Sequence, residues 1–597
     1  MHTPEVTKMG GAGGVRELDD PVAEPRAARA GAPPVREKER WGTAGAVLIV
    51  CLMTLPFLVF FLLSREGAPA VWQSAGAKLT AMSGGFMNAS CAASTAATKK
   101  AAATTKAAAA TMADELLGGL LAPGFDRRSC RSRYESPQYY KYSPYKPSSY
   151  LLHKLRAYEA RHRKCAPGTP LYAKSVEHLR SGRNAEDTEC SYVVWLPFEG
   201  LGNRMLAMMS GFVYALLTDR VLLVDLPQDS TDLFCEPFPN TTWVLPPDFP
   251  VPNLFRLGWS PDASYKNLVA KKKIMRDPAN GTVLSVPPYV YLDLAHEARF
   301  MDKLFFCSDD QRVLAKVNWL LLYSDLYLAP ALYSMPEFHG ELQRMFPAKE
   351  SVAHLLARYL FHPTNAVWGL ITRYYTSYLA EAKQRIGVQI RMFPFATIPV
   401  DDMYNQILAC SRQEHILPEV DGEEAVTIGN LNTTDGGDDA AASGSTAILV
   451  ASLYAEYYER IRSMYYEHAA KGGVRVGVFQ PSHEGRQVTG KLAHNQKALA
   501  EIYLLSFSDV LLTTGMSTFG YMSSSLAGLR PTVLSVAFHH KVPKTPCFRA
   551  VSMEPCNLEP PRAKCQGQDQ GMSVDKEDLA RHVKACEDDH RGIKFYD

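Results

Sequence analysis

The sequence lacks several features that would each point to a definite class of protein. No two cysteines have the C-x-x-C spacing of zinc sites and thioredoxin-like centres, so metal or redox clusters of that kind are not expected. The 64 basic and 62 acidic residues leave a net charge of only +2, so we expect no nucleic-acid partner. Strongly hydrophobic runs are also scarce, because Gly42–Leu63 is the only one.

Cysteine is present but not clustered. Of the twelve cysteines, ten lie from Cys130 to Cys586, far beyond the hydrophobic run. An even number suits disulfides if this part of the chain occupies an oxidising compartment. The alternative is that several are buried free thiols, which large folds tolerate.

The run Gly42–Leu63 is expected to cross a membrane. Its 22 residues carry no charge and would extend about 33 Å as a helix, which is enough for a bilayer core. Five basic residues lie just before the run, between Arg26 and Arg40, and only two lie in the matching stretch after it. This bias predicts an uncleaved signal anchor, with the preceding residues in the cytosol and the following ones in the lumen.

Low-complexity segments flank this run. Residues 1–41 are rich in Gly, Ala, Pro and mixed charge, and they are predicted to be a disordered cytosolic tail. Residues 64–150 run through Ala, Thr, Ser, Lys, Tyr and Pro, a composition that predicts a luminal stem rather than a folded core. All the N-x-[ST] sequons fall on the predicted luminal side and permit glycosylation there. They begin at Asn88, Asn240, Asn280 and Asn432.

From about residue 190 onward, short apolar strands alternate with helices. Tyr192–Leu196 and the apolar stretch that ends at Asp225 are predicted strands, with a helix between them. Later strands are predicted at 290–294, 319–323, 386–391, 448–452, 474–480 and 510–514. Helices are predicted at 351–385 with a break at Pro363, at 453–468, at 495–507 and from Thr518 onward. Repeated βα alternation implies parallel sheets with helices on both faces.

This order predicts an α/β fold with two Rossmann-like domains that face a cleft, the arrangement called GT-B, preceded by the transmembrane helix. A chain of 597 residues is too long for a single core. We assign residues 151–370 to an N-terminal domain, and 371–597, with a cysteine-rich tail, to a C-terminal domain. Residues 421–445 are interpreted as an exposed insertion. Doubly wound sheets bind ligands at the carboxyl ends of their strands, so we expect site residues in the loops that follow.

The loop Gly200–Asn203 (GLGN) follows a strand and opens a helix. In that position glycines let backbone N–H groups approach a phosphate or sugar, and the helix terminus favours an anion. The candidate binding residues here are Gly200, Gly202, Asn203 and Arg204. A tight turn without a ligand is one alternative. A nicotinamide site with Asp225 as the ribose-binding acid is another, although Met205 occupies the place of its third glycine.

Arg391 ends the predicted strand 386–391. A guanidinium at a strand end is costly unless it meets an anion, and a diphosphate is the obvious one. The planar group can hold phosphoryl oxygens and neutralise the charge on a leaving nucleotide. An ordinary surface ion pair is the alternative.

The segment after the strand 510–514 begins a helix with two hydroxyl side chains. Its candidate binding residues are Ser517, Thr518, Phe519 and Gly520. Free N–H groups at a helix start suit a phosphate, although an ordinary helix cap would have the same residues. We expect this segment and Arg391 to grip the diphosphate together.

Two further segments, one after the strand 474–480 and one at the start of the next helix, offer polar groups for a purine base and ribose. The candidate residues are Gln480, Ser482, His494 and Asn495. Glu501 and Tyr503 lie within that helix and are interpreted as packing or capping residues.

Several long strings resemble the plant xyloglucan-type α-1,2-fucosyltransferase family (glycosyltransferase family 37). They lie in order between Ser191 and Asp597 and read LGNRMLAMMSGFVYALLTDRVLLVD, DLFCEPFPNTTW, DKLFFCSDDQ, RYLFHPTNAVWGLITRYY, IGVQIR, HNQKALAEIYLL, STFGY and SMEPC. The resemblance is specific because many long strings agree. The chain departs from the family pattern at Glu199 and at Gly515–Met516, which bears on the acceptor more than on the reaction class.

This resemblance implies an inverting enzyme that transfers L-fucose from GDP-fucose to the 2-hydroxyl of a galactosyl or related residue of a cell-wall polysaccharide or arabinogalactan glycan. It also implies a Golgi membrane protein with a luminal catalytic part. No metal cofactor is expected, and the absence of any D-x-D sequence agrees with this. The expected partners are GDP-fucose, a glycan acceptor and the Golgi membrane, and a homodimer is left open.

The resemblance implies roles for particular residues. The family's nucleotide-binding arginine falls on Arg391, and its STFGY and HNQKA strings begin at Ser517 and His494. Its acidic residue near the acceptor falls on Asp325 in WLLLYSDLY, so Asp325 is our first candidate for the base and Glu199 the second. Either carboxylate could instead only accept hydrogen bonds from sugar hydroxyls. The alternative functions are a membrane-anchored glycan-binding protein without catalysis and an NAD-dependent oxidoreductase.

Overall fold

The computed structural model describes residues 116–140, 144–185, 188–254, 257, 261–276, 283–296, 301–421, 444–560, 565 and 576–597. All of them belong to one unit of the chain, Ala96–Asp597. The predicted tail, the predicted membrane span and most of the predicted insertion lie outside the described residues. Within the described ranges, no helix has both the length and the apolar character that a membrane crossing needs.

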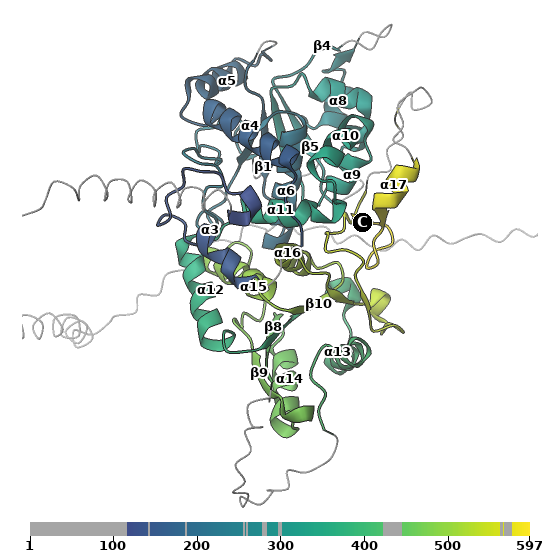
Figure 1. Ribbon diagram of the computed structural model, residues 1–597. Coiled ribbons are helices and arrows are strands. Elements are labelled where there is room, and N and C mark those ends of the chain that lie inside the picture. The colour runs from purple at the N-terminus through teal and green to yellow at the C-terminus, as the bar shows by residue number, and fades with distance from the viewer. Residues whose placement is uncertain are drawn as a thin grey trace, which may run out of the picture. The chain divides into compact units, whose positions relative to one another are not determined.

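The first half of the fold, where Figure 1 labels β1 and β5, is built on a parallel sheet. Its strand order is β2-β1-β6-β5. Its strands are β1 (Tyr192–Leu196), β2 (Val221–Val224), β5 (Tyr289–Asp293) and β6 (Trp319–Tyr323). Every residue of β1 and β2 is buried, as expected when helices cover both faces of a parallel sheet. The helices of this half are α4 (Ser149–Cys165), α5 (Pro170–Arg180), α6 (Leu201–Leu217), α7 (Tyr265–Ala270), α8 (Ser308–Leu314), α9 (Ala329–Tyr333), α10 (Pro336–Met345) and α11 (Val352–Leu360).

The second half is built on a sheet with the order β12-β11-β10-β7-β8-β9, parallel except for β12. Its strands are β7 (Gln384–Ile390), β8 (Ser445–Ser452), β9 (Arg475–Phe479), β10 (Val510–Thr514), β11 (Thr532–Leu534) and β12 (Cys547–Arg549). Its helices are α12 (Asn365–Tyr378), α13 (Val400–Glu414), α14 (Ala455–Glu467), α15 (Leu492–Ser506) and α16 (Thr518–Ala527). The predicted α/β class with two parallel sheets is confirmed.

Each sheet reverses its strand order at one point. In the first sheet β1 lies between β2 and β6, so the chain extends the sheet first on one side of β1 and later on the other. In the second sheet β7 lies between β8 and β10 in the same way. The loops after β1 and β6, and those after β7 and β10, therefore flank the crevices where doubly wound sheets bind ligands.

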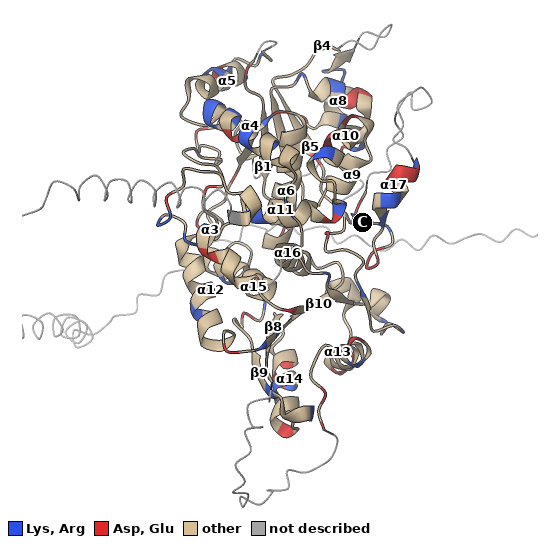
Figure 2. Ribbon diagram, in the orientation of Figure 1, with Lys and Arg blue, Asp and Glu red and all other residues tan. Residues whose placement is uncertain are grey.

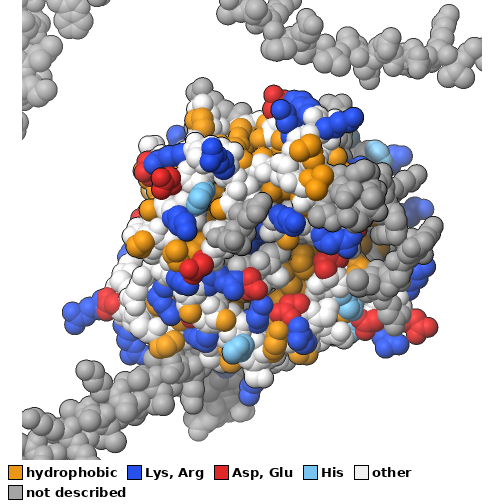
Figure 3. Space-filling model, turned by 90° about the horizontal axis from the view of Figure 1, so that it is seen from above, with side chains coloured by type: hydrophobic (Ala, Val, Ile, Leu, Met, Phe, Trp, Pro, Cys, Tyr) orange, Lys and Arg blue, Asp and Glu red, His pale blue; other side chains and the backbone are white. Residues whose placement is uncertain are grey.

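Helices α6 and α16 bring the two halves together, and they contact each other along their first turns. Arg204 is the only charged residue in α6, and α16 has none, so both helices are almost free of blue and red in Figure 2. A helix without charge on any side is suited to burial on all sides. On the face shown in Figure 3, basic and acidic side chains are interspersed, in keeping with the balanced net charge.

The segment 116–150 differs from the predicted stem. It forms η1 (Leu116–Gly119), α3 (Ser132–Glu135) and η2 (Ser136–Tyr139). Leu120 and Leu121 are buried, and the ring of Tyr139 stacks on Phe507 at a centroid distance of 5.0 Å. The prediction of a spacer without buried side chains is wrong for these residues, because they complete a core that the rest of the chain provides.

The C-terminal residues return to the first half. The Tyr327 hydroxyl donates a hydrogen bond to Glu554 Oε2 at 2.6 Å, and the Tyr333 hydroxyl donates one to Asp578 Oδ2 at 2.9 Å. The predicted border at residue 370 falls within α12. The remaining elements are α17 (Lys576–His582), the hairpin of β13 (Val583–Ala585) and β14 (Ile593–Phe595), and the hairpin of β3 (Met275–Arg276) and β4 (Val283–Ser285).

The ten cysteines between Cys130 and Cys586 are all paired. The disulfides are Cys130–Cys235, Cys165–Cys190, Cys307–Cys565, Cys410–Cys547 and Cys556–Cys586. The prediction of disulfides is confirmed, and free thiols are excluded for these ten residues.

Candidate active site

The glycine loop after β1 lies directly against the start of α16. A Cβ atom on Gly202 would lie 2.6 Å from Thr518 Oγ1 and 3.1 Å from the backbone nitrogen of Phe519, so only glycine permits this approach. On the other side of the loop, a Cβ atom on Gly200 would lie 2.7 Å from Gln487 Nε2. The predicted residues Gly200, Gly202, Thr518 and Phe519 are thus brought together where the two halves meet.

A chain of hydrogen bonds runs from α16 into the first half. The Thr518 hydroxyl donates to Asn203 Oδ1 at 2.6 Å, and Asn203 Nδ2 donates to Asp325 Oδ2 at 3.4 Å. The backbone N–H of His296 donates to Asp325 Oδ1 at 2.9 Å, and Asp325 Oδ2 lies 2.6 Å from His296 Nδ1. One network therefore joins the loops after β5 and β6 to the first turns of α6 and α16.

Asp325 is the inner member of a carboxylate–imidazole pair. Asp325 is 4% exposed, whereas the His296 side chain is 42% exposed. The His296 ring also lies nearly parallel to that of Phe198, at 16° and a centroid distance of 5.9 Å. A carboxylate bound to one ring nitrogen fixes the orientation and tautomer of an imidazole.

His296 was not among the residues predicted from the sequence. Its position in the sequence could have identified it. His296 lies two residues beyond the predicted strand 290–294, and therefore at the carboxyl edge of the sheet, where ligands bind. The expectation that Asp325 itself meets the acceptor does not fit its burial. Glu199, the second candidate, is exposed in the left-handed conformation with φ 59°.

Arg204 is engaged within the protein. Its Nη1 donates to Asp229 Oδ1 at 2.8 Å and to Ser230 Oγ at 2.9 Å, and its Nε donates to the Glu199 carbonyl at 3.0 Å. Because Asp229 neutralises its charge, Arg204 shapes the glycine loop rather than offering a free cation to a nucleotide.

Arg391 lies just beyond the end of β7 and beside β10. Its backbone N–H donates to Thr514 Oγ1 at 3.0 Å. Thr514 is the last residue of the neighbouring strand β10 and precedes Ser517 by three residues. The guanidinium is half-buried and lies 5.8 Å from the ring centroid of Phe393. Among the described residues no carboxylate forms an ion pair with Arg391, so the ion-pair alternative is not supported.

The start of α16 offers backbone N–H groups to the same crevice. Ser517 occupies the N-cap position, but no side chain caps the helix. The N–H groups of a first helical turn have no partner inside the helix. A Cβ atom on Gly520 would lie 2.8 Å from Thr513 Cβ, so glycine keeps α16 close to β10.

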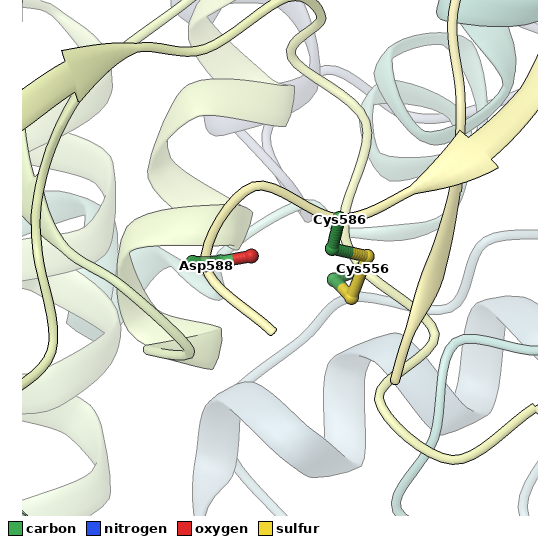
Figure 4. A group of neighbouring side chains, drawn as sticks. All are labelled: Cys556, Cys586 and Asp588. Atoms are coloured by element: carbon green, nitrogen blue, oxygen red, sulfur yellow. A yellow bond between two sulfur atoms is a disulfide. The ribbon is translucent and has the colours of Figure 1, made fainter. Parts of the chain in front are cut away.

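A C-terminal loop holds the segment that leads into α16. Asp588 Oδ2 accepts hydrogen bonds from the Met516 N–H at 2.8 Å and from the Tyr521 hydroxyl at 2.5 Å. Asp588 lies beside the Cys556–Cys586 disulfide (Figure 4). These three groups are near enough for a shared metal ion, but the joined sulfurs offer no thiolate, so they form no metal site.

Gln480 and Ser482, predicted to contact the base or ribose, hydrogen-bond largely within the protein. Gln480 Nε2 donates to the carbonyls of Ser452 at 3.1 Å and Ser482 at 2.9 Å. The Ser482 hydroxyl donates to Glu501 Oε1 at 2.6 Å, and burial raises the pKa of Glu501 to about 7. Within the described residues, Gln480 Oε1 is buried without a hydrogen-bond partner, so one acceptor remains at the carboxyl end of β9.

His494 and Asn495 fix the start of α15. Asn495 Nδ2 donates to the Asp229 carbonyl of the first half at 3.0 Å. His494 Nε2 accepts from the Val488 N–H at 3.3 Å. Both residues position loops of the crevice, and the Tyr503 hydroxyl, bonded to the Phe361 carbonyl at 2.6 Å, serves packing as predicted.

The fold and the site together define a class of protein. Two Rossmann-like sheets face each other through their carboxyl edges, and the starts of α6 and α16 meet there. Arg391 lies beside the strand that leads into α16, and no carboxylate of the described residues forms an ion pair with it. This is the organisation of a GT-B glycosyltransferase.

Comparison with known proteins narrows the class to a family. The family model for xyloglucan fucosyltransferase matches residues 89–566. A galactoside 2-alpha-L-fucosyltransferase of Pisum sativum is 47% identical over 485 residues, 81% of this chain and 82% of that protein. The one of Arabidopsis thaliana is 46% identical over 484 residues, 81% of this chain and 83% of that protein. The chain belongs to the xyloglucan fucosyltransferase family, as its sequence strings predicted.

A solved structure agrees with this assignment. A mutant of Arabidopsis thaliana FUT1 in complex with GDP matches with a TM-score of 0.70 and 44% identity, over 81% of this chain and 100% of that chain.

Proposed function

We propose that this chain transfers L-fucose from GDP-fucose, with inversion, to the 2-hydroxyl of a galactosyl residue in a plant cell-wall polysaccharide or arabinogalactan glycan. The names of its relatives and the GDP bound by FUT1 support this reaction. The structural observation that carries it is the hydrogen bond between Arg391 and Thr514, which places Arg391 at the switch point of the second sheet, beside the end of the strand that leads into α16.

The diphosphate of the donor is assigned to this crevice on electrostatic grounds. Each helix N-terminus has an effective charge of roughly half a positive unit, and α6 and α16 meet there. Together with the Arg391 guanidinium, they form a site that an anion stabilises. The same groups would neutralise the charge that develops on GDP as the bond to fucose breaks, without a metal ion. Gln480 Oε1, which has no hydrogen-bond partner among the described residues, would accept an N–H of the guanine base.

The galactosyl residue that receives fucose is assigned to the first half. The acceptor oxygen forms a bond to the anomeric carbon of fucose while the bond to the diphosphate oxygen breaks. The hydroxyl proton passes to the partly exposed imidazole of His296, directly or through one water, and Asp325 stabilises the resulting imidazolium. In this proposal Asp325 acts through His296 rather than as the base itself.

A type II orientation in the Golgi membrane is part of the proposal, with Gly42–Leu63 as the span and the described residues in the lumen. The charge bias around this run supports the orientation. The five disulfides support an oxidising compartment.

The test is incubation of the purified protein with labelled GDP-fucose and a panel of galactose-containing plant glycans. We expect release of GDP and an α-1,2-linked fucosyl product, identified by NMR. Acceptor binding without GDP release would favour the glycan-binding alternative instead. In a parallel binding screen, we expect GDP to bind and NAD not to bind.

A further inference from the structure

Three phenylalanine rings form a row at the edge of the second sheet. Phe393 and Phe395 follow β7, Phe538 follows β11, and we call these three residues the phenylalanine platform. The ring centroids of Phe393 and Phe395 are 5.4 Å apart, and those of Phe395 and Phe538 are 6.2 Å apart. The interplanar angles are only 16° and 21°, so the three rings lie nearly parallel in one stacked apolar row.

The platform is open to solvent. Phe395 is 47% exposed and Phe538 is 42% exposed. Side chains of this size are normally buried, and a cluster that stays exposed marks a ligand or partner surface.

The base under the platform is fixed. The short helices η6 (Pro394–Ala396) and η9 (Phe538–His540) contact each other. Ala396 and Ala537, in the same two loops, are buried. His540 Nδ1 lies 2.9 Å from the Thr397 carbonyl, which ties the two loops together. The exposed rings are therefore held in place before any ligand arrives.

The platform is continuous with the proposed donor site. Phe393 lies against the Arg391 guanidinium. Since β10 lies between β7 and β11, the two loops that hold the platform flank the loop that leads into α16. A molecule on the platform would thus lie beside the place proposed for the diphosphate.

We propose that the phenylalanine platform binds sugar rings of the acceptor glycan beyond the galactosyl residue that receives fucose. The inference rests on the proposed function. Pyranose rings stack on aromatic rings through their apolar C–H faces, and a row of rings suits a chain of neutral sugars. A single purine, the other flat ligand of the reaction, needs only one ring.

The test compares the full-length protein with its Phe395→Ala/Phe538→Ala double variant, on a long galactose-bearing oligosaccharide and on a galactosyl disaccharide. We expect the KM of the oligosaccharide to rise about tenfold, while the KM of the disaccharide and that of GDP-fucose stay the same. Phe395→Trp should keep the wild-type KM. Tyr466→Ala, which removes a 90% exposed ring on α14, is the matched control and should change nothing.

The outcomes separate this inference from the proposed function. An unchanged oligosaccharide KM, or an equal rise for both acceptors, would overturn the platform as a glycan subsite. A rise in the KM of GDP-fucose instead would assign the rings to the purine. If the wild-type protein transfers no fucose, the proposed function fails, and calorimetry with the oligosaccharide then tests the platform separately. Binding to the wild type that is lost in the double variant would support the platform as a glycan subsite. Equal binding to both proteins, or no binding to the wild type, would overturn it.

Discussion

The Thr518 hydroxyl donates a 2.6 Å hydrogen bond to Asn203 Oδ1, and so joins the first turn of α16 to the first turn of α6. The two residues are 315 positions apart in the sequence. Asn203 follows β1 in the first sheet, and Thr518 follows β10 in the second sheet. Through Asn203 the contact extends to Asp325 and His296. Groups assigned to the donor and to the acceptor therefore belong to one hydrogen-bonded network.

The close contact at Gly202 gives a direct test of this junction. Gly202→Ala would force a Cβ atom against Thr518, and we expect at least a tenfold loss of kcat/KM together with a lower melting temperature. Gly340→Ala in α10 is the matched control, because nothing lies within 4 Å of its added Cβ atom. The control should raise stability slightly, since alanine is the better helix former. Equal kinetics in both variants would contradict the role of the junction.

The Asp325–His296 pair predicts coupled effects on the rate. We expect Asp325→Ala and His296→Ala each to lower kcat about 100-fold with little change in the Kd of GDP. The double variant should lose hardly more than either single one, because the two side chains act as a unit. Losses that multiply would show that the residues act independently.

The Asp588 contact predicts an effect on nucleotide affinity at a distance from the nucleotide. Asp588→Ala would leave the Met516 N–H without its acceptor, and we expect the Kd of GDP to rise about tenfold. Tyr521→Phe removes only the second donor to the same oxygen and should have a smaller effect. A fall in melting temperature with an unchanged Kd would reduce Asp588 to a purely structural role.

The buried carboxyl of Glu501 predicts a pH dependence of stability. Burial raises its pKa from 4.5 to about 7, so the folded protein keeps a proton that the unfolded chain releases between those values. The free energy of unfolding should therefore fall as the pH rises from about 4.5 to 7, by up to about 3 kcal/mol from this group.

Chemical denaturation at several pH values checks this slope. Glu501→Gln should make the slope shallower, whereas Glu456→Gln, at an exposed position on α14, should leave it as in the wild type. An unchanged slope in Glu501→Gln would contradict the assignment. Glu554, whose pKa burial raises to about 8, contributes a slope of the same sign that both variants keep.

Local pattern predicted the strands well. The predicted strands 319–323 and 510–514 coincide with β6 and β10, because each is a short apolar run with polar residues at its ends. Arg391 was expected within a strand and lies one residue beyond β7, which places its side chain nearer the crevice. The glycine loop and the start of α16 were located by the rule that ligands bind at strand ends.

Pairings between distant residues could not be predicted. Arg204 and Asn495 were both expected at the nucleotide, yet both bond to Asp229, which no local pattern connects to either. The buried residues Leu120 and Leu121 belong to a segment without periodicity, so composition alone predicted a stem. In each case the outcome depends on a partner supplied by tertiary structure.

The most direct measurement is the affinity for GDP of Arg391→Ala by isothermal titration calorimetry, with Arg475→Ala as a control at the exposed amino end of β9. Arg391 is the cation assigned to the diphosphate, so we expect its variant to bind GDP at least about 100-fold more weakly than the wild type while melting at the same temperature, and the control to bind normally. Equal affinity for GDP in Arg391→Ala and the wild type would contradict the proposed donor site.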